Sequence, residues 1–128
     1  MLDHFGYVAS DFERSKAFYE KALAPLGYAV VMEVGPEETG GPRHCGFGAA
    51  GKPDFWIGDA GAPSGPFHMA FAAADRAAVD AFHAAALAAG ATDNGAPDPR
   101  PHYHPDYYGA FVLDPDGHNI EAVCHRPE

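Results

Sequence analysis

An internal repeat restricts the possible folds of this chain more than any other feature. Residues 4–8 read His-Phe-Gly-Tyr-Val and residues 68–72 read His-Met-Ala-Phe-Ala, an offset of 68 − 4 = 64 positions. The same offset aligns four further pairs: Asp11 with Asp75, Ala17 with Ala81, Phe18 with Phe82, and Leu23 with Leu87. Each copy is too short to bury a hydrophobic face alone. We therefore expect one domain over 1–128, built from half-modules at about 1–60 and 66–128.

Each copy shows the same order of secondary structure. Alternating strands are predicted at 3–8 and 67–72, and an amphipathic helix follows each strand, to about Leu26 in the first copy and Ala89 in the second. Three short β segments come next: 28–34, 44–48 and 54–57 in the first copy, and near Thr92, 108–113 and 119–124 in the second. This order predicts an α+β fold in which two tandem βαβββ modules form a curved mixed sheet around a cleft.

The ends of the two helices carry recognisable signals. Ser10 and Glu13 have the spacing of a capping box, with Asp11 as an alternative N-cap, and Asp75 is the expected cap of the second helix. A glycine follows each helix, Gly27 and Gly90, as expected for a left-handed C-terminal turn.

Composition and charge exclude several classes of partner. The net charge of −10, with only eight Lys and Arg residues, argues against binding to nucleic acid or to an anionic membrane surface. Cys45 and Cys124 lie among apolar neighbours, so we expect buried, reduced thiols. No apolar run approaches the roughly 20 residues that span a bilayer, and no signal-peptide pattern is present, which predicts a cytoplasmic protein.

The repeat, the histidine that begins each copy and the segment 111–121, Phe-Val-Leu-Asp-Pro-Asp-Gly-His-Asn-Ile-Glu, resemble one known group of proteins. This group is the vicinal oxygen chelate superfamily, which contains glyoxalase, bleomycin-resistance and extradiol dioxygenase proteins. The resemblance covers essentially the whole chain. It implies a small-molecule substrate, but the superfamily includes lyases, epimerases, dioxygenases, transferases and plain binding proteins, so it leaves the reaction open.

The resemblance also implies a metal site on the first and last strands of the two copies. It assigns His4, His68 and Glu121 as ligands of one divalent ion, with Fe, Mn, Ni and Zn all compatible. The fourth position aligns near Phe55 or Trp56, and neither side chain is a metal ligand. The four-ligand set of glyoxalase I is therefore incomplete, which argues against lactoylglutathione lyase activity. The alternative is that the three residues line a polar cavity without a metal.

Other candidate site residues lie in the loop before the strand at 108–113. His104, Tyr107 and Tyr108 are candidates for a general acid or base, or for hydrogen bonds to a metal-bound oxygen. Trp56 and Arg43 are candidates for substrate binding, although core packing for Trp56 and a solvated surface position for Arg43 are the simpler alternatives.

Three functions remain open at this stage. The first is a metal-dependent enzyme acting on a small substrate with vicinal oxygens, by lyase, isomerase, dioxygenase or transferase chemistry. The second is a metal-free binding or sequestering protein of the bleomycin-resistance type, and the third is an interaction module without a small ligand. The resemblance also implies a homodimer, in which metal ligands come from one chain or from two.

Overall fold

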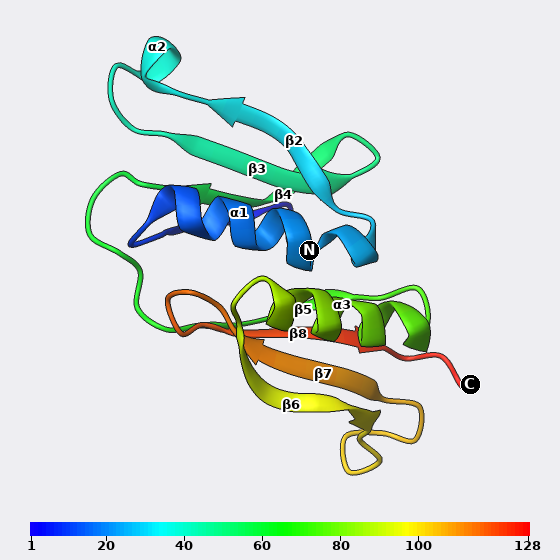
Figure 1. Ribbon diagram of the computed structural model, residues 1–128. Coiled ribbons are helices and arrows are strands. Elements are labelled where there is room, and N and C mark those ends of the chain that lie inside the picture. Colours follow the sequence, from blue (N-terminus) through cyan, green and yellow to red (C-terminus); the bar gives the residue numbers. More distant parts are fainter.

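The computed structural model describes residues 1–128 and consists of two βαβββ modules (Figure 1). The first module contains β1 (Phe5–Val8), α1 (Phe12–Ala22), the 3-10 turn η1 (Ala24–Leu26), β2 (Ala29–Val34), the short helix α2 (Pro36–Thr39), β3 (His44–Ala49) and β4 (Lys52–Gly58). The second module contains β5 (His68–Ala72), α3 (Arg76–Ala88), β6 (Thr92–Pro99), β7 (Tyr108–Leu113) and β8 (Asn119–Cys124).

Each module forms its own four-stranded mixed sheet. The strand orders are β1-β4-β3-β2 and β5-β8-β7-β6, so each module repeats the topology of the other. In each sheet the first strand pairs in parallel with the last, and the other pairs are antiparallel. The α+β class and the duplicated βαβββ arrangement are confirmed. The strands separate into two sheets, since no backbone ladder joins the modules.

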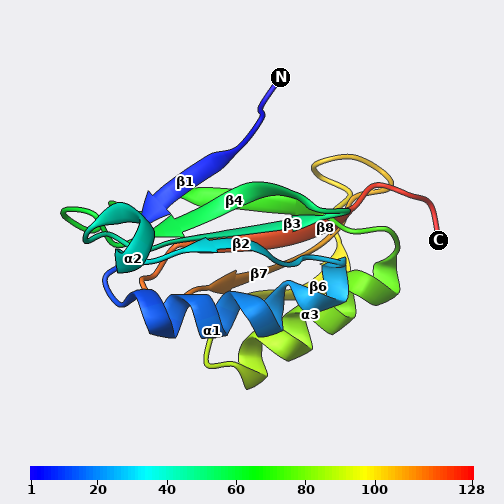
Figure 2. The ribbon, with the colours of Figure 1, turned by 90° about the horizontal axis from the view of Figure 1, so that it is seen from above.

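Both long helices lie on the same side of the two sheets, where they pack against each other (Figure 2). Residues that alternate inward along the strands meet these helices and form one hydrophobic core of 20 buried residues, which draws on both modules. The opposite surface of each sheet, called the open face below, points away from the helices. The site residues on the strands must lie on this open face to reach a ligand.

Asp11 caps α1, because its side chain accepts a hydrogen bond from the Arg14 backbone N–H. The capping box predicted for Ser10 and Glu13 is therefore wrong, and Ser10 instead bonds to Asp116 of the second module. Asp75 caps α3 as predicted. α1 ends at Ala22, before the predicted end, because the following Ala-Pro-Leu segment forms a 3-10 turn with a proline near its start.

A buried hydrogen bond joins the two modules at the turn between β7 and β8. The Tyr19 hydroxyl on α1 donates to Oδ2 of Asp114 at 2.5 Å, and both residues are buried. The other oxygen of Asp114 accepts the backbone N–H groups of Asp116 and His118, each at 2.9 Å. The Asp-Pro-Asp-Gly turn thus orders itself and also fixes the first module against the second.

Cys45 and Cys124 are buried and unpaired, as predicted. Burial raises the pKa of the Cys45 thiol to about 12. No helix combines the length and the apolar character that a membrane crossing requires.

Candidate metal and substrate site

His68 and Glu121 meet on the open face of the second module. The pairing of β5 with β8 places Glu121 opposite Ala70, two residues from His68 on the same strand face. His68 Nε2 lies 3.1 Å from Glu121 Oε1. The Glu121 side chain is 2% exposed, whereas that of His68 is 50% exposed, so the pair joins a buried carboxylate to an accessible imidazole.

The backbone determines which nitrogen of His68 carries its hydrogen. His68 Nδ1 lies 3.0 Å from the Asn119 carbonyl oxygen, which only accepts hydrogen bonds, so Nδ1 is protonated. A neutral imidazole then presents an unprotonated Nε2 to a carboxylate oxygen of Glu121. Two acceptors that face each other require a cation between or beside them, either a proton or a metal ion. This donor set fits a divalent metal, since metal-bound histidines usually donate their other ring N–H in this way.

Tyr107 holds the second oxygen of Glu121. Its hydroxyl donates a hydrogen bond to Glu121 Oε2. Burial, and then the hydrogen bond to Glu121, raise the pKa of Tyr107 well above its ordinary value, so the hydroxyl remains a donor near neutral pH. Gly109 makes this contact possible, because a Cβ there would lie 3.1 Å from both Glu121 Oε2 and the Tyr107 ring. Tyr107 therefore orients the carboxylate.

His4 repeats the pattern of His68 in the first module. Its Nδ1 lies 2.8 Å from a carboxylate oxygen of Asp3, which leaves Nε2 free, and its side chain is 60% exposed. The hydrogen bond from His4, followed by Lys52, lowers the pKa of Asp3. No group of three or more His, Cys, Asp or Glu side chains converges within one chain, so His4 does not join His68 and Glu121 in this monomer.

Trp56 lies on the open face of the first module, at the position that Glu121 occupies in the second. Trp56 pairs with Gly6 and Glu121 pairs with Ala70, and Gly6 and Ala70 are repeat-equivalent. The pairing therefore assigns the fourth position to Trp56 and not to Phe55, whose buried ring belongs to the core. The second carboxylate of a four-ligand site is replaced by an indole.

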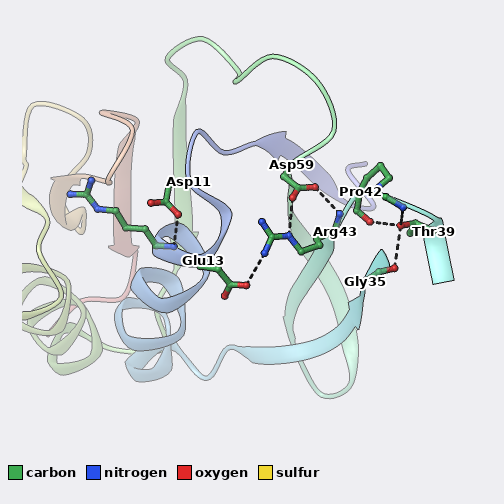
Figure 3. Close-up of polar contacts among 9 residues, drawn as sticks. Asp11, Glu13, Gly35, Thr39, Pro42, Arg43 and Asp59 are labelled. Carbon is green, nitrogen blue, oxygen red and sulfur yellow. Dashed lines mark hydrogen bonds and ion pairs between the residues drawn. The ribbon is translucent and has the colours of Figure 1, made fainter. Parts of the chain in front are cut away.

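Tyr108 and Arg43 lie away from this site. The Tyr108 hydroxyl donates to Asp80 on α3 at 2.6 Å, so it faces the helices. Arg43 donates through Nε to Asp59 at 2.8 Å and through Nη1 to Glu13 at 2.9 Å (Figure 3). Its guanidinium also lies 4.7 Å from the centre of the Phe12 ring on the helix side. The guanidinium of Arg43, one candidate for substrate binding, is thus already paired with two carboxylates.

His104 lies beside the site, where it pairs with His125. His104 Nδ1 accepts the Asp106 backbone N–H at 3.0 Å, and Nε2 lies 2.6 Å from His125 Nδ1. Both rings contact the Tyr107 ring edge to face, with centroids 5.4 Å and 5.2 Å away. Both nitrogens of His104 are occupied, so its contact with the site runs through Tyr107. The spacing of four residues from Glu121 was the available signal for His125.

The sequence matches the family model of the Glyoxalase/Bleomycin resistance protein/Dioxygenase superfamily over residues 1–122. The chain belongs to this superfamily, as its duplicated fold also indicates. No curated protein matches the sequence.

Solved structures agree with this assignment. A glyoxalase/bleomycin resistance protein from Albidiferax ferrireducens T118 is 31% identical, with a TM-score of 0.78 and 99% of both chains covered. Glyoxalase I from Zea mays is 20% identical, with a TM-score of 0.72, and our chain spans 45% of its length. A mutant of the fosfomycin resistance protein FosX from Listeria monocytogenes, complexed with Mn(II), is 18% identical over 95% of this chain and 90% of that one, with a TM-score of 0.69.

Proposed function

We propose that this protein is a metal-dependent enzyme that acts on a small substrate with two neighbouring oxygens, and that His4, His68 and Glu121 hold one divalent ion. The observation that carries the proposal is the approach of His68 Nε2 to Glu121 Oε1 while Nδ1 is bound to a carbonyl. His4 adds a second imidazole whose Nδ1 faces a carboxylate and whose Nε2 is free. Two imidazoles and one carboxylate leave coordination positions open for substrate.

We propose further that the protein is a homodimer in which His4 of one copy joins His68 and Glu121 of another. The three side chains do not converge within one chain, although each histidine presents Nε2 on an exposed side chain. Closed twofold pairing is the commonest assembly of soluble proteins, and it would bring equivalent residues of both copies to two identical sites.

Each protein residue has a distinct role in this proposal. The metal, when bound, supplies Lewis acidity to substrate oxygens, with Fe, Mn, Ni and Zn as candidates. Tyr107 holds Glu121 in one orientation, His104 supports the Tyr107 ring, and Trp56 forms an apolar wall. Lyase, isomerase, dioxygenase and transferase chemistry are each compatible with such a site. The two buried free thiols suit a reducing compartment, so we propose that the enzyme acts in the cytoplasm.

Metal binding tests the proposal directly. We expect purified protein to bind one equivalent of Mn(II), measured by the loss of the free-ion electron paramagnetic resonance signal, and Mn(II) is the ion in the FosX structure. His68→Ala should abolish this binding. His83→Ala is a suitable control. His83 also contacts a carboxylate, that of Asp93, but this pair joins α3 to β6 and lies away from the proposed metal site. Equal binding by wild type and His68→Ala would overturn the proposed site.

Mixing two variants that each lack one proposed metal ligand distinguishes a metal site within one chain from a site shared between two chains. His4→Ala and His68→Ala, unfolded and refolded together, would form mixed dimers in which one of two shared sites has all its ligands. We expect about a quarter of the wild-type Mn(II) sites to return. No recovery, or a monomer by light scattering, would contradict the shared site.

A metal-free binding protein is the second candidate, and Trp56 favours it. The indole replaces a carboxylate at the position equivalent to Glu121, which makes the first module's contribution apolar. Retention of ligand by chelator-treated protein, together with absence of metal from the protein as isolated, would favour this function over the enzyme.

A further inference from the structure

On the open face of the first module, three positions next to Trp56 carry no side chain. Three glycines on three strands surround it: Gly6 on β1, Gly46 on β3 and Gly58 on β4. The strand pairing identifies their counterparts around Glu121 as Ala70, Phe111 and Val123. The same fold therefore carries three larger side chains in one copy and none in the other. The glycines are not needed for the sheet itself, because the second module forms the same sheet without them.

The indole of Trp56 occupies part of the space that these glycines leave. A Cβ on Gly46 would lie 2.9 Å from Trp56 Cζ2 and 3.0 Å from Cε2, so the ring covers the β3 backbone there. A Cβ on Gly6 would lie 3.5 Å from the Trp56 Cβ, which is an ordinary contact. Trp56 itself is half-buried, so part of the indole remains available to a ligand.

A pocket of about 250 Å³ opens beside the indole. It is lined by Gly6, Val8, Trp56, Gly58 and the linker after β4, with His44 among its lining residues. Ser64 closes the linker side, where its hydroxyl accepts the Val8 backbone N–H at 3.0 Å. An engineered cavity of about 150 Å³ is large enough for benzene, so this pocket has room for a substituted ring.

His44 gives the pocket a polar group. Its ring packs over Gly58, with Nδ1 3.0 Å from the place of a Cβ, and the residue is half-buried. An imidazole both donates and accepts hydrogen bonds, which suits a hydroxyl group. The net charge of −10 disfavours an anionic ligand. No lysine or arginine lines the pocket, so nothing there offsets that repulsion.

From these observations we infer that the Trp56 pocket binds an uncharged aromatic ring that carries a hydroxyl group, with the ring against the indole and the hydroxyl at His44. One part of the inference rests on the proposed function: in the enzyme, this ring would be the part of the substrate that does not react. Binding to the pocket itself needs no metal.

The single tryptophan of the chain reports this binding. We would titrate chelator-treated protein with 4-methylphenol and with 4-methylcyclohexanol, a match in size and hydroxyl group without the aromatic ring. We expect a saturable change in Trp56 fluorescence, with the phenol binding about three- to tenfold more tightly. No saturable change with the phenol, or equal affinity for both probes, would overturn the inference.

Variants locate the ligand. Gly6→Val adds bulk to the pocket from a strand position that suits a β-branched residue, and it should weaken phenol binding at least about tenfold. Ala72→Val adds a similar side chain to β5, at the counterpart of Val8, and should leave phenol binding unchanged. If Gly6→Val unfolds, Gly6→Ala reproduces the residue of the second copy without a close contact and should show a smaller loss.

The two proposals fail independently. Phenol binding without Mn(II) binding would overturn the metal proposal and leave this inference standing. Mn(II) binding without phenol binding in the Trp56 pocket would overturn this inference alone.

Discussion

The two modules share one topology but differ at the centre of their open faces. The second module places Glu121 beside Ala70 and Phe111, where the carboxylate is held by Tyr107 and faces His68. The first module places Trp56 beside Gly6 and Gly46 at the same pairing positions. Duplication thus preserved the backbone while the side chains diverged into a polar half-site and an apolar pocket. The difference teaches that the second module supplies a carboxylate that the first lacks, and the first supplies an apolar pocket that the second lacks.

The carboxylate of Glu121 is the largest chemical difference between the two modules, so its removal should have the largest effect on Mn(II) affinity. Glu121→Gln preserves the shape but removes the anionic oxygen that faces His68. Loss of a supporting contact alone costs about 10- to 100-fold in metal affinity, so loss of this ligand should cost at least about 100-fold. Mn(II) titration by electron paramagnetic resonance measures the change. Wild-type Mn(II) affinity in this variant would contradict the proposal that Glu121 is a metal ligand.

The two adjacent tyrosines test how the polar half-site is supported. Tyr107→Phe removes the hydrogen bond to Glu121 and should weaken Mn(II) binding about 10- to 100-fold. Tyr108→Phe removes a hydroxyl that bonds to Asp80 on the helix side, so Mn(II) affinity should stay within about twofold of wild type. Equal effects from both substitutions would show that Tyr107 acts through general stability and not through Glu121.

The turn before β8 offers a test of how the modules hold together. Asp114→Asn weakens the buried hydrogen bond from Tyr19 of the first module, and should lower the free energy of unfolding by about 2 kcal/mol. The corresponding turn of the first module leads into Lys52, the first residue of β4, whose ion pair with Asp3 is exposed. Lys52→Gln should therefore change stability by less than about 0.5 kcal/mol. Urea denaturation measures both. A neutral Asp114→Asn would mean that the hydrogen bond between Tyr19 and Asp114 does not help to hold the modules together.

Trp56→Glu would give the first module the carboxylate that the second one has. A fourth ligand near His4, and the second with a negative charge, should raise Mn(II) affinity about tenfold in the proposed dimer. The same variant should abolish phenol binding at the pocket. Trp56→Gln is the matched control, because it removes the indole without adding a charge. If both variants bind Mn(II) equally, Trp56 does not face the metal ligands of the second copy.

The smallest effect near neutral pH concerns the two buried thiols, one in each sheet. The pKa of Cys45 is raised to about 12 from its ordinary value of 9.0 by burial. A raised pKa favours the neutral thiol in the folded protein, so this stability is fully present below about pH 9 and is lost as pH rises toward 12. Cys45→Ala should therefore flatten the stability loss between about pH 8 and pH 11, measured by urea unfolding. An unchanged pH dependence of the free energy of unfolding would contradict a raised pKa of Cys45.

Much of the fold follows from local sequence patterns. The offset of 64 residues, the alternating strands, the Asp75 cap and the glycines after each helix predict two copies of one βαβββ unit. Short-range preferences decided these features, and Gly27 and Gly90 adopt the left-handed conformation with φ of 83° and 106°. Ser10 shows where local reasoning fails, because Asp116, 106 residues away in the sequence, takes the side chain that a cap would have used.

The sequence by itself determined which residue types are present at the paired strand positions: a histidine at the start of each copy, Glu121 near the end of one, and aromatic residues near the end of the other. Only the tertiary structure decided which of them share a face. Strand pairing made Trp56 and not Phe55 the counterpart of Glu121, and it directed Tyr107 to Glu121 but Tyr108 to the helices. The physical reason is that neighbouring side chains on a strand point to opposite faces, so one step of register separates a site residue from a core residue.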